Sequence, residues 1–188
     1  MSEETARRLA EAKEQEAEQR TVVDALKQQC LDLIADGLPG RLDDYVKGIA
    51  HGQPDVTKQL GRDGIIALRK EVSEAADNLG AELRNSAAQI KWPTYAYGWP
   101  RHKGVTSSLF EFLDGSRVNK IDQILKSLGY KIEQHSGLHP HSLYEHEAAY
   151  GELEAQLATL TSKSNDVAAA KEADDHDTVD SLWDDTSS

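Results

Sequence analysis

The sequence predicts a mainly α-helical protein in which long amphipathic helices pack antiparallel, with a small α+β insert and a disordered acidic C-terminal tail. Apolar residues recur at helical spacing in residues 64–90 and again in residues 143–161. Hydrophobic residues make up only 38% of the 188 residues and charged residues 29%, a balance typical of amphipathic helices and disorder. Residues 162–188 are small, polar and acidic, which predicts the disordered tail.

The N-terminal segment, residues 1–36, is expected to form one long helix. It has no proline or glycine between Glu3 and Asp36 and consists mostly of good helix formers. Its first half carries few apolar positions and is expected to project from the domain. Gly37 and Pro39 are expected to end the helix. The second half is expected to be buried through an apolar stripe: Val22, Val23, Leu26, Cys30, Leu33 and Ile34.

Residues 37–161 are expected to form a helical domain that begins with a short helix over residues 41–50. Ser142 and Glu145 have the spacing of a capping box at the start of its last helix. The two apolar seams are expected to pack antiparallel on each other, or one of them binds a second copy of the chain in a homodimer. The first seam is Ile65, Leu68, Val72, Ala76, Leu79, Leu83, Ala87 and Ile90. The second seam is Leu143, His146, Tyr150, Leu153, Leu157 and Leu160.

Residues 92–135 are expected to form the small α+β insert within that domain. Tyr95, Tyr97 and Trp99 alternate along the chain, as side chains do on one face of a β-strand. The rest of the insert is expected to contain a strand or short helix at 107–115, an amphipathic helix at 118–128 and a strand at 130–134.

Composition excludes several classes of protein. The only cysteine is Cys30, so an internal disulfide and a multi-thiolate zinc site are excluded. No stretch has the apolar length of a secretory signal or a membrane span, so a cytoplasmic protein without membrane contact is expected. No nucleotide-binding glycine motif and no catalytic signature occurs, so we expect neither enzyme activity nor a cofactor.

The acidic tail contains an apolar motif that predicts binding to another protein. Val179, Leu182 and Trp183 fall on one face if the motif becomes helical on contact. The partner is expected to have an apolar groove with a basic rim. The alternatives are that the motif docks on the chain's own basic segment, or that the tail only aids solubility. The acidic residues assigned to this contact are Asp180, Asp184 and Asp185.

A second candidate site is the basic aromatic segment, residues 91–126. The net charge is −12, yet residues 91–135 contain seven Lys or Arg against four Asp or Glu. Aromatic and basic side chains in one segment can stack on bases and contact phosphates. Nucleic-acid binding is therefore the alternative function, with the acidic tail as a competitor. Its candidate residues are Lys91, Trp99, Arg101, Lys103, Arg117 and Lys120.

Histidines His135, His139 and His141 are the only candidates for a metal site. His139 and His141 flank Pro140, and their spacing would let two imidazoles reach one ion. No HExxH motif or cysteine partner accompanies them, so no bound metal is expected. The sequence therefore predicts a non-enzymatic adaptor or regulatory subunit that acts by recognition.

Overall fold

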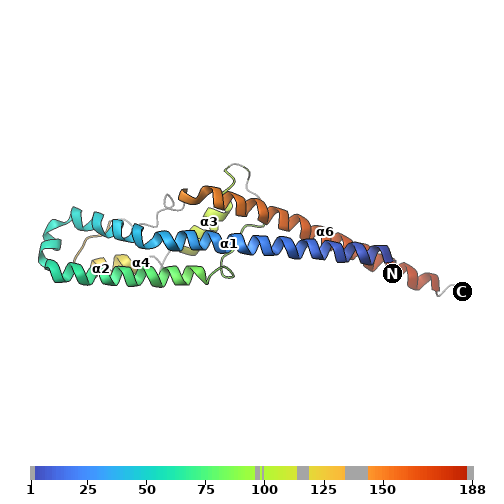
Figure 1. The fold of residues 1–188 in the computed structure, drawn as a ribbon, viewed down its shortest axis with the longest axis horizontal. Coiled ribbons are helices and arrows are strands. Elements are labelled where there is room, and N and C mark those ends of the chain that lie inside the picture. Colours follow the sequence, from blue (N-terminus) through green and yellow to red (C-terminus); the bar gives the residue numbers. More distant parts are fainter. Residues whose placement is uncertain (1–2, 96–97, 99, 114–118, 134–143, 186–188) are drawn as a thin grey trace.

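The computed structural model describes residues 3–95, 98, 100–113, 119–133 and 144–185, with the side chains of residues 119, 144 and 180–185 left out. The chain forms an elongated array of helices (Figure 1). Within the described ranges there is no β-strand, so the mainly α class is confirmed. The helices are, in order, α1 (Glu3–Gly52), α2 (Pro54–Arg84), α3 (Lys103–Leu113), α4 (Asn119–Ser127), the 3-10 turn η1 (Tyr144–His146) and α6 (Glu147–Asp185).

Helix α1 is the spine of the molecule and is longer than expected, because it runs through Gly37 and Pro39 to Gly52. A proline inside a helix costs about 3 kcal/mol. Burial on both sides offsets that cost, since Leu38 and Leu42 are 0% and 1% exposed. The expected helix end at residues 37–39 is therefore wrong: tertiary packing overrides a local stop signal.

Helices α2 and α6 both pack on α1, which lies between them in Figure 1. Helix α2 runs antiparallel to the C-terminal half of α1, and the Arg84 guanidinium at its end pairs with Asp36 at 2.5 Å. Helix α6 runs antiparallel to the N-terminal half of α1. The two apolar seams thus face mainly α1, rather than each other as expected.

Two apolar clusters form the interior. One joins the middle of α1 to the end of α2, to α3 and to the start of α6, with Leu31, Leu109 and Leu153 completely buried. The other joins the end of α1 to the start of α2 and to α4, around Leu68 and Leu125. Most positions of the two expected seams are buried in these clusters, so their helical periodicity correctly marked the core.

Helix α3 depends on a buried carboxylate. Glu154 of α6 is 1% exposed, and its Oε2 accepts backbone hydrogen bonds from Gly104 (3.0 Å) and Val105 (3.3 Å) in the first turn of α3. These N–H groups have no partner within their own helix, and a negative charge at a helix N-terminus is favourable. The contact fixes α3 against α6.

The insert contains helices but no strand in its described part. Helix α4 confirms the amphipathic helix expected at 118–128, and residues 107–113 belong to α3. The strands expected at 95–99 and 130–134 are wrong wherever they are described, because Thr94 and Tyr95 form a bend and residues 130–133 are irregular. Pro93 and Pro100 bracket the aromatic run and remove ladder donors, which outweighs its alternation.

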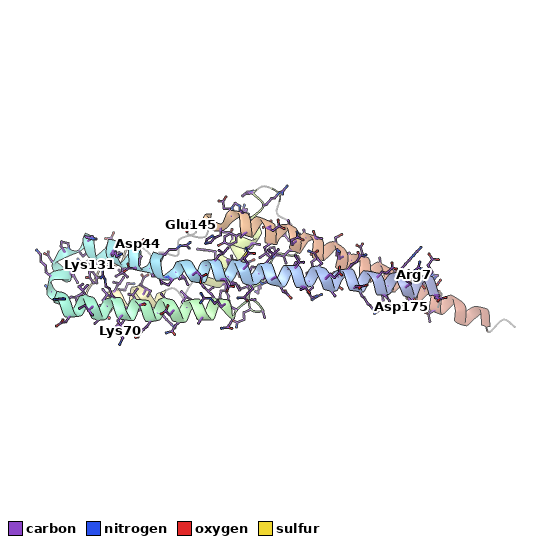
Figure 2. All side chains as sticks on the ribbon, in the orientation of Figure 1. Arg7, Asp44, Lys70, Lys131, Glu145 and Asp175 are labelled. Carbon is purple, nitrogen blue, oxygen red and sulfur yellow. The ribbon has the colours of Figure 1, made fainter. Side chains whose placement is uncertain are left out.

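The C-terminal segment is helical instead of disordered. Helix α6 continues to Asp185, and its distal half lies beside the first half of α1 (Figure 1). Two expectations are therefore corrected together, since the polar first half of α1 and the acidic tail are each other's partner. We call α1 residues 3–22 and α6 residues 161–185 the arm. Figure 2 places Arg7 and Asp175 near the same end of it.

Candidate functional site

The two helices of the arm meet along a seam of polar and small residues. On α1 the partly shielded positions are spaced alternately by four and three, as in a coiled coil. On α6 a similar spacing occurs. We call these positions the polar seam: Thr5, Leu9, Ala12, Glu16 and Gln19 on α1, and Ser164, Val167, Ala170, Asp174 and Asp177 on α6.

Side-chain hydrogen bonds cross the seam at successive levels. Thr5 Oγ1 donates to Asp177 Oδ2 at 3.2 Å. Ser164 Oγ donates to Glu16 Oε1 at 2.8 Å, which helps to lower the pKa of Glu16. Gln19 Nε2 donates to Gln156 Oε1, also at 2.8 Å. The numbers rise on α6 as they fall on α1, so the register is antiparallel.

The arm lacks a dry core over its described side chains. None of residues 3–22 or 158–179 is fully buried, whereas Val23 and Leu153 at its base are 0% exposed. The Oδ1 atom of Asp174 is buried without a hydrogen-bond partner among the described residues. The arm is therefore held mainly by polar contacts, each of which contributes only about 1 kcal/mol net.

Negative charge is concentrated at the C-terminal end of the arm, where it is unfavourable. Residues 162–185 contain eight Asp or Glu and two Lys. The last turn of α6 has no basic residue, and Asp184 and Asp185 lie at the negative end of the helix dipole. An external cationic surface would offset this charge.

The acidic-apolar motif lies at the tip of the arm. Helix α6 continues past the first residue of α1, so its final turns have no neighbouring helix in Figure 1. Val179 is 51% exposed there. The side chains of Leu182, Trp183, Asp180, Asp184 and Asp185 lie outside the described part, although their backbone is helical. Val179, Leu182 and Trp183 therefore share one helix face by register.

In the part of the chain that the structure describes, helix α6 carries this motif away from the chain's own basic segment. Thr161 Oγ1 donates to the carbonyl of Thr94 at 2.7 Å, so the segment lies beside residue 161 of α6. Val179 follows 18 residues later, about 27 Å further along a helix at 1.5 Å per residue. Helix α6 therefore holds the motif away from its own basic segment.

Two lysines of the basic segment, Lys91 and Lys120, line different grooves in the described part of the chain. Lys91 lines a groove of about 310 Å³ with Ser108 and Phe112 of α3. Lys120 lines a different groove, of about 540 Å³, whose α2 wall includes Glu71 and Glu82.

The other candidate residues of the basic segment lie at the start of α3 or outside the described residues. Arg101 and Lys103 are exposed at the start of α3, while Trp99 and Arg117 lie outside the described residues. Trp92 is structural, since its indole Nε1 donates to the Ala87 carbonyl at 2.8 Å.

The histidine cluster His135, His139 and His141 lies outside the described residues. His146 packs edge-on against Tyr150, with ring centroids 6.2 Å apart. The part of the chain that the structure describes holds no group of three or more His, Cys, Asp or Glu arranged for a metal ion. Cys30 is buried, and burial raises its pKa to about 12, so it stays a thiol and is a poor nucleophile.

Comparisons with protein-family models, with curated proteins and with solved structures found no match to this chain. Every helix in the described ranges is too short or too polar to cross a membrane. The candidate site therefore rests on the chain's own geometry and charge.

Sequence reasoning missed the arm because its seam is not apolar. The signal that would have found it is spacing alone: positions 5, 9, 12, 16, 19, 23, 26 and 30 alternate by four and three. Arg41 was missed as well. Its guanidinium pairs with Glu145 at 2.6 Å and joins α1 to η1, just before α6, a contact between residues far apart in the sequence.

Proposed function

We propose that this chain is a non-enzymatic adaptor or regulatory subunit whose arm presents an acidic-apolar motif to a partner protein. The partner would have an apolar groove for Leu182 and Trp183 and a basic rim for the surrounding aspartates. The observation that carries the proposal is the 51% exposure of Val179 on a helix that outruns its neighbour. A cytoplasmic location belongs to the same proposal.

A helical tip favours binding more than a disordered one. Burial of a Leu or Trp side chain contributes about 1.5–3 kcal/mol. A disordered segment gives part of this back when it orders, whereas a helix already formed in the free protein gives back less. Basic groups on the partner would also neutralise Asp184 and Asp185 at the helix end.

The test is a pull-down with the full chain carrying Trp183→Ala. Loss of the partner with unchanged helicity by circular dichroism supports the proposal. The matched control is Asn165→Ala, an exposed position on the same helix but three turns or more before the tip. Retention of the partner by Trp183→Ala, or its loss with Asn165→Ala, would reject the tip as the binding site.

Nucleic-acid binding remains the alternative function. Arg101 and Lys103 are both exposed, and Tyr95, six residues before Arg101 in the sequence, is 58% exposed, so these side chains are accessible for stacking on bases and for contact with phosphates. Lys91 and Lys120 line different grooves, which weakens this alternative. It predicts that Arg101→Ala with Lys103→Ala abolishes salt-dependent binding of a single-stranded oligonucleotide. A homodimer through the helix seams has less support, because α1 already covers both.

A further inference from the structure

We propose that the inner face of α6 in the arm is a second docking face, which becomes available when the arm opens at its polar seam and which takes a basic helix in place of α1. This rests on the proposed function, since it extends the contact made by the tip to the same kind of basic partner. The inner face is the α6 side of the polar seam, from Ser164 to Asp177.

Helix α1 fits this face poorly. The α1 side of the seam is Thr5, Leu9, Ala12, Glu16 and Gln19, with no cationic side chain. Opposite it lie Asp174 and Asp177 of α6. Asp177 accepts a hydrogen bond from Thr5, but Oδ1 of Asp174 is buried with no partner among the described residues. A buried carboxylate oxygen without a donor destabilises the pairing that buries it.

Both helices of the arm are acidic. Residues 3–22 of α1 have six Glu against four Arg or Lys, and residues 162–185 of α6 have eight acidic residues against two Lys. Ion pairs of α1 in this region include Arg8 with Glu4 and Arg20 with Glu16, and both lie within α1 itself. Lys163, which is partly shielded beside Ser164, is at the proximal end of the seam. Like charges on paired helices oppose their association.

The apolar packing lies outside the arm. It begins next to the arm, at Val23 of α1 and Leu157 of α6. The arm can therefore open without disturbing that cluster, as a local event of low cost. A helix with lysines opposite Asp174 and Asp177, and apolar residues opposite Val167 and Ala170, would satisfy what α1 leaves unsatisfied.

Hydrogen exchange on the full chain tests the opening step without a partner. We expect the amides of residues 5–19 and 164–178 to exchange at least about tenfold faster than those of residues 30–38 and 150–157. Asp174→Leu removes the carboxylate whose Oδ1 is buried without a partner among the described residues, and should slow exchange in the arm about tenfold. The matched control is Asp175→Leu, which makes the same charge change at an exposed position and should change exchange less than twofold. Equal protection of the arm and its base would overturn the proposal.

The exchange of partners is tested with a synthetic helix that has leucine at its heptad core positions and lysine elsewhere. Added to the full chain, it should expose the amides of α1 residues 5–19 while those of α6 residues 164–178 stay protected. A version of the peptide with glutamate in place of lysine should leave the exchange of both segments as it is in the free chain. If the lysine peptide binds while α1 stays protected, the inner face is not a docking face. Trp183→Ala should leave the arm's exchange unchanged, so failure of the tip as a docking motif and failure of this inference are distinguishable.

Discussion

Replacement of Glu154 should destabilise the fold more than any other single change of a charged residue on α6. Its carboxylate is 1% exposed and accepts the backbone N–H groups of Gly104 and Val105. Glu154→Ala leaves both N–H groups buried without an acceptor. Each unsatisfied group costs about 1–3 kcal/mol, so the free energy of unfolding should fall by about 2–6 kcal/mol.

Glu154→Gln separates the acceptor from the charge. The amide oxygen can still accept one hydrogen bond at the start of α3, but the favourable interaction with the helix dipole is lost. We expect a loss of about 1–2 kcal/mol. The control is Glu152→Gln, an exposed position on the same helix, which should change stability by less than about 0.5 kcal/mol.

Urea unfolding followed by circular dichroism measures the three variants. From least to most destabilised, the expected order of the variants is Glu152→Gln, Glu154→Gln, Glu154→Ala. Faster hydrogen exchange in α3 is also expected for the two Glu154 variants. A Glu154→Ala protein within about 0.5 kcal/mol of the wild type would refute the role assigned to this carboxylate.

Three further predictions test other parts of the fold. Gly61 has φ 64° and ψ −174° at a kink in α2, a conformation almost confined to glycine. Gly61→Ala should therefore lower the free energy of unfolding by about 1–3 kcal/mol. Gly48 lies in open space within α1, so the control Gly48→Ala should be neutral or stabilising. Tyr150 is fully buried and its hydroxyl has no partner among the described residues, so in thermal unfolding Tyr150→Phe should lie within about 1 kcal/mol of the wild type or be more stable. Burial raises the pKa of Cys30 from 9.0 to about 12. The stability of the wild type relative to Cys30→Ala should therefore be constant below about pH 9 and fall as the pH rises towards 12. Urea unfolding across that pH range measures this difference.

The sequence predicted the helices and the core correctly where apolar periodicity marks them. Leu68, Val72 and Leu83 on α2, and Tyr150, Leu153 and Leu157 on α6, are buried as their spacing indicates. It failed where tertiary contacts override local signals. Pro39 is accommodated because its neighbours Leu38 and Leu42 are buried, which local composition does not reveal.

The candidate site was predicted only in part. The acidic-apolar motif was found from its composition, but the arm that carries it was not. A seam of Thr5, Glu16, Gln19, Ser164 and Asp174 has no apolar signal, and its pairing spans most of the chain. The same acidic composition that predicts disorder is compatible with a helix once a second helix lies beside it.

The proposed function depends on α6 holding the acidic-apolar motif away from the rest of the chain as a continuous helix. The most direct measurement is the distance between spin labels at Tyr95→Cys and Val179→Cys, in a full chain that also carries Cys30→Ala. Tyr95 and Val179 are exposed, and the bond from Thr161 to Thr94 fixes the first label near residue 161. A single distance on the order of 30 Å is expected from the helical rise. A short distance would mean that the motif docks on its own basic segment, and a broad distribution would mean that the segment is disordered; either result would contradict the account.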